Sequence, residues 1–288
     1  RDSVASRGLG DVYKRQPLYR LSPIVAPYSI PLARLNWMHT RAQVYSPLQN
    51  TAVWLAAWLY NVESTDDTLD ALTDLGGTHT YCDAPMVQLL SDVRAAADLE
   101  SPDPVVRLIL WGPGQAPRLR AGSPAMDALS QAGALVVRGD GISHILVPDY
   151  SGAEVRWRWF EETERLPEPD WLTPGEADQL LSRATDEAAV LIEAAGGTTK
   201  ELPNPRLTVG TLADFYDTPG LPAGVTARAA KLFARADRVA ATIETVTERL
   251  DDHSFDPHLF ALWRHVRTAR MAGVADAVID YRREYLAN

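Results

Sequence analysis

One stretch of this chain constrains its fold more than any other, and it lies between Ala134 and Phe160. Three strand-like runs occur in it: Ala134–Arg138, Ile142–Pro148 and Glu154–Phe160. Asp140-Gly141 stands between the first two runs, and such a pair favours the positive φ angles of a tight hairpin turn. Asp149–Gly152 supplies a second turn. The stretch therefore predicts an antiparallel meander of three strands.

Two more strands are predicted before the meander, at Thr78–Cys82 and Val105–Trp111. Helical periodicity over Pro85–Leu99 separates them, and Ser123-Pro124 opens a short helix before the meander. Because a helix stands between successive strands, parallel pairing with right-handed crossovers is expected. Added to the meander, these strands give a mixed sheet of about five strands.

Helices are predicted on both sides of this sheet region. Before it, Ser46-Pro47 and Ser64 each have the residue types of a helix start. After it, three longer helices are predicted: Glu176–Ala195, Thr226–Leu250 and Pro257–Tyr285. The break between the last two is short, so they are expected to form a long antiparallel helix pair.

The expected fold class is therefore α+β, with an α+β domain over residues 17–173 and a helical region over residues 174–288. Residues 1–16 read RDSVASRGLGDVYKRQ, which resembles translated sequencing-adaptor read-through. The chain also opens with arginine rather than methionine. We therefore expect a non-native tail there, with a genuine disordered tail as the alternative.

Charge and cysteine content narrow the class of protein. The formal net charge is −10, which argues against broad binding of nucleic-acid phosphates because that needs a basic surface. Cys82 is the only cysteine, so no internal disulfide can form, and a reducing compartment, the cytoplasm, is expected. No apolar run approaches the roughly 18–20 residues that span a bilayer, so no membrane contact is expected.

The loop that follows the second predicted strand is a candidate ligand site. Glycines at the end of a buried strand let the backbone approach a phosphate closely, which makes Trp111, Gly112 and Gly114 candidates for ligand binding. Pro113 removes one N–H donor, however, and neither a third fingerprint glycine nor a Lys-Ser/Thr pair follows. A structural turn is the favoured interpretation.

Three residues are candidates for catalysis: His79, Cys82 and His144. The spacing of the first two could serve a zinc site or a Cys–His nucleophile pair. No further ligands follow at matching spacing, so no metal is predicted, and strand alternation places these two side chains on opposite faces. His144 alternates with apolar Ile142 and Leu146, which favours a histidine in the core.

Basic and aromatic residues alternate over Val155–Phe160. On a strand, Arg156 and Arg158 share one face with Phe160 while the tryptophans face the other way, an arrangement that could stack single-stranded nucleic acid. Glutamates on both sides would repel phosphates. An edge strand whose arginines pair with these acids is therefore the favoured interpretation.

Three arginines follow one another at helical spacing near the end of the chain: Arg264, Arg267 and Arg270. They could form an anion-binding stripe. The favoured interpretation is a solvated helix face with salt-bridge partners, since acidic residues are about as frequent in this region.

Five segments of the chain carry a resemblance to known sequences: Val106–Leu110, Gly112-Pro113-Gly114, Gly133–Val137, Val155–Trp159 and Pro174–Ala177. Together they are similar to a group of actinobacterial conserved proteins without an assigned function. The similarity covers about half of the chain. It implies an actinobacterial origin and brings no catalytic residues to carry over.

No motif in the sequence fixes a chemistry, since P-loop, H-E-x-x-H and C-x-x-C patterns are absent. The leading hypothesis is a non-catalytic protein, regulatory or scaffolding, that binds a small ligand or a protein partner through its C-terminal helices. The alternative is an enzyme with its site at the sheet edge near Trp111–Gly114, where His79 and His144 would act as acid and base. Nucleic-acid binding through Arg156 and Arg158 is the third hypothesis. No cofactor is predicted, and the oligomeric state is left open.

Overall fold

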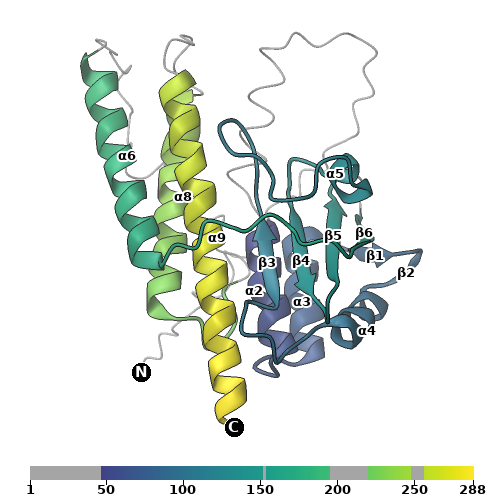
Figure 1. The fold of residues 1–288 in the computed structure, drawn as a ribbon. Coiled ribbons are helices and arrows are strands. Elements are labelled where there is room, and N and C mark those ends of the chain that lie inside the picture. Colours follow the sequence, from purple (N-terminus) through teal and green to yellow (C-terminus); the bar gives the residue numbers. More distant parts are fainter. Residues whose placement is uncertain (1–46, 152–153, 195–219, 248–255) are drawn as a thin grey trace, which may run out of the picture.

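The computed structural model describes residues 47–151, 154–194, 220–247 and 256–288. Figure 1 shows a sheet with helices packed behind it, standing beside a bundle of long helices. The predicted tail at residues 1–16 and the helix-start residue Ser46 lie outside the described residues. The predicted α+β fold class is confirmed.

The sheet has six strands rather than the predicted five, in the order β2-β1-β6-β5-β4-β3. Along the chain they are β1 His79–Tyr81, β2 Ala84–Pro85, β3 Val106–Ile109, β4 Ala134–Arg138, β5 Ser143–Asp149 and β6 Val155–Glu162. The additional strand is β2, whose two residues are too few to leave a periodic pattern in the sequence. The predicted meander is confirmed, with Ile145 of β5 paired to Val136 of β4 and to Phe160 of β6.

Both expected parallel pairings, of the first predicted strand with the second and of the second with the third, are wrong. β3 pairs with β4 in antiparallel orientation, and β1 pairs in parallel with β6. The chain passes through α4 (Met86–Ala96) from β2 at one edge of the sheet to β3 at the opposite edge, so β1 and β3 are not neighbours. We expected an edge strand at Val155–Phe160, but β6 lies inside the sheet because β1 pairs with its outer side.

Shorter helices surround the sheet, namely α2 Pro47–Leu59, α3 Thr65–Gly76, α4 and α5 Pro124–Ala128. Two predicted helix starts are confirmed by their caps. The hydroxyl of Ser64 accepts the Asp67 N–H at 3.1 Å, and that of Ser123 accepts the Met126 N–H at 3.2 Å. α2 is buried on nearly all sides, with Trp54 as its one partly exposed residue, because it lies between α3, the sheet and α9.

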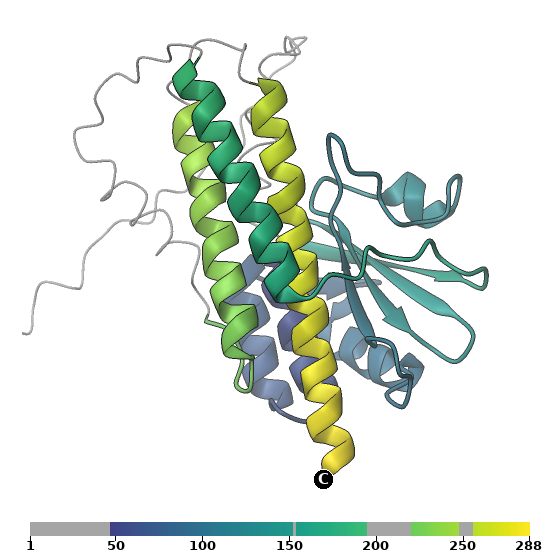
Figure 2. The same cartoon turned by 60° about the vertical axis from the view of Figure 1, so that its left-hand side comes forward.

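Three long helices form the bundle: α6 Pro174–Ala194, α8 Ala227–Thr247 and α9 Asp256–Ala287. In Figure 2, α6 and α8 run in the same direction and α9 runs opposite to both. The predicted long antiparallel pair, α8 with α9, is therefore confirmed. α6 begins with a capping box, in which the Thr173 hydroxyl accepts the Glu176 N–H and the Glu176 carboxylate accepts the Thr173 N–H.

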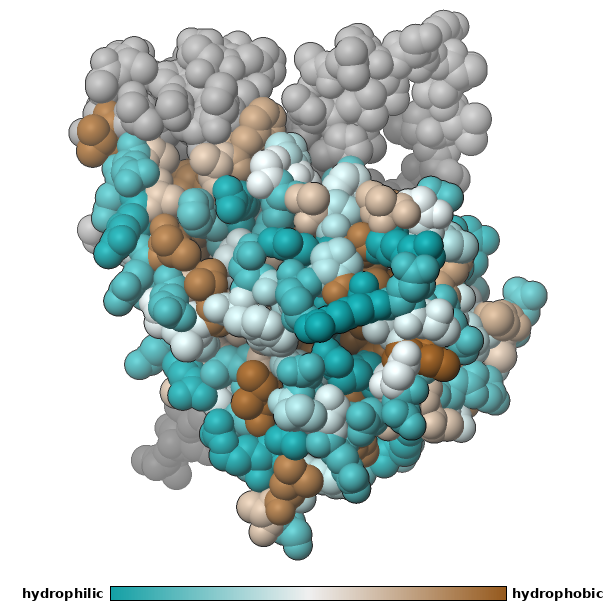
Figure 3. Space-filling model, in the orientation of Figure 1, coloured by the Kyte–Doolittle hydropathy of each residue, from teal (hydrophilic) through white to brown (hydrophobic). Residues whose placement is uncertain are grey.

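α9 belongs to two of the hydrophobic cores. The largest core joins the helix-covered face of the sheet to α2, α3, α4 and α9, through residues such as Leu135, Trp157 and Tyr281. A second core lies inside the bundle around Trp263, and a third lies on the opposite face of the sheet beside α5. The face shown in Figure 3 is mostly hydrophilic where it is coloured, and its apolar residues lie in small separate groups.

Two of the C-terminal arginines are buried, which corrects the expected solvated face. Arg267 and Arg270 are 3% and 2% exposed. Arg270 pairs with Asp237 of α8 at 2.7 Å, while Arg267 donates to the Gln115 side chain at 2.8 Å and to the Pro113 carbonyl at 2.9 Å. A buried guanidinium requires such partners, and here they come from distant parts of the chain.

We expect Gly273→Ala to destabilise the protein by about 1–3 kcal/mol. A Cβ at this position of α9 would overlap the buried ring of Phe233 on α8, lying 2.9 Å from its Cζ. This overlap outweighs the gain in helix propensity of about 1 kcal/mol. Gly175→Ala is the matched control, because its Cβ would meet nothing closer than 4.0 Å. Urea denaturation measures both, and a Gly273→Ala protein as stable as its parent would contradict this packing.

Candidate functional site

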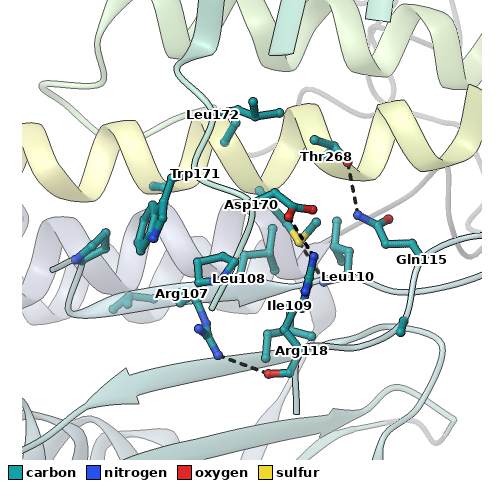
Figure 4. A pocket seen from close by; sticks show the side chains of 17 residues that line it. Arg107, Leu108, Ile109, Leu110, Gln115, Arg118, Asp170, Trp171, Leu172 and Thr268 are labelled. Atoms are coloured by element: carbon teal, nitrogen blue, oxygen red, sulfur yellow. Dashed lines mark hydrogen bonds and ion pairs between the residues drawn. The ribbon is translucent and has the colours of Figure 1, made fainter. Parts of the chain in front are cut away.

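The free edge of β3 lines a narrow groove of about 50 Å³ that we call the edge groove (Figure 4). The segment 169–172 and α9 close its other sides. At one end, the Leu110 N–H donates to the Met271 sulfur of α9 at 3.4 Å. Most of the described lining is apolar and includes Val106, Leu108, Trp171, Leu172, Met271 and Ala272.

A second cavity of about 280 Å³ adjoins the edge groove, and we call it the polar cavity. It lies against the face of the sheet that α5 partly covers, and its lining includes Asp103, Arg138, Ser143, Glu162, Arg165 and Glu168. The two cavities share Pro104, Arg107 and Trp171. An elongated molecule could therefore contact an apolar wall at one end and polar groups at the other.

Alternation along β3 leaves backbone polar groups directed at the edge groove. The Val105 carbonyl accepts the Arg138 N–H at 2.8 Å, which places the hydrogen-bonding groups of residues 105, 107 and 109 on the β4 side. The N–H and C=O groups of Val106 and Leu108 therefore point away from β4. The edge groove thus combines apolar walls with amide donors and acceptors.

Arg107 lies where the two cavities meet and gives the site its charge. Its guanidinium donates to the carbonyl oxygens of Pro167 and Arg118, both at 3.3 Å, and its Nε has no hydrogen-bond partner among the described residues. Burial lowers the pKa of Arg107 to about 10, helped by the positive charge of Arg138 and opposed by Glu168. The group stays charged at neutral pH, so an anion bound beside it would be stabilised.

The neighbouring arginines already have carboxylate partners. Arg118 pairs with Asp170 at 2.9 Å, and Arg138 pairs with Asp103 at 3.0 Å. Within the described part of the chain, Arg107 has neutral carbonyl acceptors and no carboxylate at ion-pair distance. Its charge is therefore the one in this region that a ligand could neutralise.

Trp171 is a large apolar side chain left exposed beside the site. It is 49% exposed and lines both cavities. Figure 4 shows Trp171 and Arg107 together among the side chains that line the edge groove. The next residue, Leu172, packs against the bundle core and fixes the segment to the helices. Exposed aromatic rings at a cavity mouth are typical of binding sites.

The predicted catalytic residues lie elsewhere. His79 is buried, and its Nδ1 accepts the Trp157 indole N–H at 2.9 Å. His144 is 8% exposed and has its Nδ1 3.8 Å from a Glu161 carboxylate oxygen. Burial lowers the pKa of both histidines, with Glu161 opposing the shift at His144. Neither lines the edge groove or the polar cavity.

Cys82 is separated from His79 by the geometry of a turn. Cys82 and Asp83 have φ angles of 50° and 59° and form the two-residue hairpin loop between β1 and β2. The thiol is exposed, whereas the His79 ring is in the core. The structure does not bring these two residues together as a nucleophile and a base.

The glycine loop forms a tight turn that docks on α9. Gly112 and Gln115 exchange backbone hydrogen bonds of 3.1 and 2.9 Å, and Gly114 has a φ of 73°. A Cβ on Gly112 would lie 2.7 Å from the guanidinium of Arg267, so a larger residue there would have to displace this side chain. The Trp111 indole N–H donates to a backbone carbonyl at 2.8 Å. These contacts support the structural turn, which borders the edge groove through Gln115.

Arg156 and Arg158 lie on the exposed face of β6, opposite the inward-facing tryptophans as predicted. Their partners differ from the expected glutamates. Arg156 pairs with Asp149 at 3.3 Å, and Arg158 donates to the Ala128 carbonyl at 2.6 Å. Both guanidinium groups therefore already have acceptors from neighbouring segments.

Two features are absent from the described ranges. No three metal-binding side chains come close enough together there to hold an ion. None of the helices in these ranges has both the length and the apolar character needed to cross a bilayer.

Two residues of the site, Arg107 and Trp171, were not predicted from the sequence. The signal for Arg107 is that its charge interrupts the apolar run Val105–Trp111.

We expect His79 to titrate below the ordinary histidine pKa of about 6.5. Burial disfavours its charged form, and protonation of Nδ1 would break the bond from Trp157. Its contribution to stability is therefore complete above about pH 6.5 and is lost as the pH falls below that value toward the lowered pKa. An NMR titration measures this, with His79→Gln to assign the signal. A His79 midpoint at or above 6.5 would contradict the buried hydrogen bond.

Comparison with known proteins identifies both parts of the chain. The family model described as the Rv1486c-like protein, N-terminal domain, matches residues 49–171. The model described as the Rv1486c-like protein, C-terminal domain, matches residues 175–271. No curated protein and no solved structure matches the chain. Since the two models together match well over half of the residues, the chain belongs to the Rv1486c-like protein family.

Proposed function

We propose that this protein is a non-catalytic binding protein for a small molecule. The ligand would carry an anionic group that binds Arg107 and an apolar part that enters the edge groove. The observation that carries the proposal is Arg107 itself, a charged and half-buried guanidinium with only neutral acceptors, placed between an apolar and a polar cavity. The cytoplasm remains its proposed location, on the basis of a single cysteine.

The present partners of Arg107 satisfy it poorly. Two carbonyl contacts at 3.3 Å are long for hydrogen bonds from a guanidinium, and neither acceptor carries charge. A carboxylate or phosphate would form shorter, charge-assisted bonds, each contributing about 1.5–3 kcal/mol. The anionic group of the ligand is therefore proposed to be one of these two.

The edge groove supports the apolar half of the proposal. Met271 and Ala272 of α9 face Val106 and Leu108 of β3 across it, so a hydrocarbon or aromatic part would be removed from water on both sides. The free amide groups of β3 could bind a polar atom of the same ligand. A mostly apolar cavity with a few directed polar groups is typical of small-molecule sites.

Binding is favoured over catalysis by the residues that line the edge groove. The described lining of the edge groove holds no histidine, cysteine, serine or lysine, and its one carboxylate, Asp170, is paired with Arg118. The enzyme hypothesis relied on His79 and His144, which are engaged in the core by Trp157 and Trp159. General acid–base catalysis requires such groups within reach of a substrate.

The other two hypotheses have less support. Nucleic-acid binding relied on Arg156 and Arg158, whose guanidinium groups are directed to Asp149 and to a carbonyl. A protein partner on the C-terminal helices stays a prediction. On the face shown in Figure 3, the coloured apolar residues lie only in small groups, where a large apolar interface would form one continuous patch.

We expect one class in a panel of aliphatic carboxylates, aromatic carboxylates and phosphate monoesters to raise the melting temperature. At about 100 times its dissociation constant, such a ligand adds roughly 2.7 kcal/mol of stability, or roughly 5–10 °C for a chain of this size. Arg107→Met should weaken its binding about tenfold or more. Binding should also quench the fluorescence of Trp171, and loss of this quenching in Trp171→Phe would place the ligand beside Trp171, where the two cavities meet.

Arg158→Met is the matched control, because it removes the same charge from the same face of the sheet outside both cavities. It should leave the affinity unchanged. The proposal fails if no compound in the panel shifts the melting temperature, or if the shift is the same in Arg107→Met and in the parent protein.

A further inference from the structure

A separate cavity lies between α6 and α8, and it is strongly basic. Its volume is about 410 Å³, and four cationic side chains of α8 line it: Arg228, Lys231, Arg235 and Arg238. We call it the basic groove. Asp178 of α6 is the one acid among its described lining residues. The whole chain has a net charge of −10, so this concentration of positive charge is local.

The sequence of α8 places these four cations on one face. They follow one another at spacings of three, four and three residues, which is the repeat of a single helical face. From the first to the last they cover about 15 Å of helix axis. Leu232, Phe233 and Ala236 of the same helix are buried in the hydrophobic cores, so the cationic face is turned to solvent.

Two of the cations are held in fixed positions. The Nε of Arg228 lies 2.8 and 3.0 Å from the two carboxylate oxygens of Asp276 on α9. Arg235 pairs with Asp178 at 3.0 Å and also donates to the Ser182 hydroxyl at 2.9 Å. These contacts hold Arg228 at one end of the basic groove and Arg235 near its middle.

Lys231 and Arg238 remain available to a ligand. Both are exposed, and neither side chain has a hydrogen bond or an ion pair with any described residue. They stand on either side of Arg235 and are seven residues apart, or about 10 Å along the helix axis. A single phosphate group is too small to bridge that separation, whereas a chain of phosphate groups can contact both.

The helix ends add to the positive potential. α6 and α8 run in parallel, so their N-terminal ends lie at the same end of the basic groove (Figure 2). Pro174 and Gly175 in the first turn of α6 line it together with Arg228, the second residue of α8. Each helix N-terminus carries the positive end of its macrodipole, which the carboxylates of Glu176 at α6 and Asp276 at α8 offset in part.

We propose that the basic groove binds a small polyphosphate anion, such as inorganic triphosphate or the triphosphate group of a nucleotide. Arginine side chains match phosphate oxygens in geometry, and several phosphates in a row match the line of cations. A long nucleic acid is disfavoured, because the net charge of −10 would repel its strand beyond the groove. The proposal is independent of the ligand proposed for Arg107.

Lysine acetylation of the full chain tests this site directly. Inorganic triphosphate should slow the acetylation of Lys231, while Lys14 and Lys200 serve as internal references in the same mass spectrum. Calorimetry should show that Lys231→Ala and Arg238→Ala each weaken triphosphate binding about tenfold. Asp178→Asn should strengthen binding, because it removes the one lining acid and frees Arg235.

Two controls separate this site from others. Arg183→Ala removes an exposed arginine of α6 that does not line the basic groove, and it should leave the affinity unchanged. Arg107→Met should also leave triphosphate binding unchanged, and a loss there would move the anion to the edge groove and overturn the proposal.

Three further results would overturn it. The first is that millimolar triphosphate does not slow the acetylation of Lys231. Another is equal affinity for citrate, which would show that several negative charges suffice without phosphate. The last is tighter binding of a single-stranded oligonucleotide through Lys231 and Arg238, which would make the ligand a nucleic acid.

Discussion

The packing of α9 along the free edge of β3 is the contact on which the rest of the structure depends. An exposed edge strand presents unpaired amide groups and invites association with other chains. Here α9 covers that edge, with the Leu110 N–H directed to Met271 and with Gly112 in contact with Arg267. The same helix supplies side chains to the core behind the sheet and to the core of the bundle. One helix therefore joins the sheet to α6 and α8.

The parts of the fold that could be predicted from the sequence are those with local causes. The meander follows from apolar runs and a glycine turn, and the caps at Ser64 and Ser123 follow from hydroxyl side chains before a helix. The order of the strands could not be predicted, because β1 pairs with β6 across some seventy intervening residues. Local patterns carry no information on such a pairing.

The candidate site was hidden for a similar reason. Arg267 and Arg270 have the spacing of a solvated face, and only the tertiary fold brings Gln115 and Asp237 to them. Arg107 is half-buried and Arg267 is buried, and burial lowers the pKa of both to about 10. They differ in their acceptors, since Arg267 has hydrogen bonds of 2.8 and 2.9 Å while the contacts of Arg107 are 3.3 Å. This difference in hydrogen-bond length can be seen only in the three-dimensional structure.

The short segment 169–175 lies between the edge groove and the basic groove and contributes residues to both. Its first residues form one wall of the edge groove, and its last residues, Pro174 and Gly175, line the basic groove. Between them, Leu172 is fixed to the bundle core and Thr173 caps α6. A molecule that displaced this wall from one side would change the shape offered to a molecule on the other. Any such coupling must be reciprocal, so each ligand would alter the affinity of the other by the same factor.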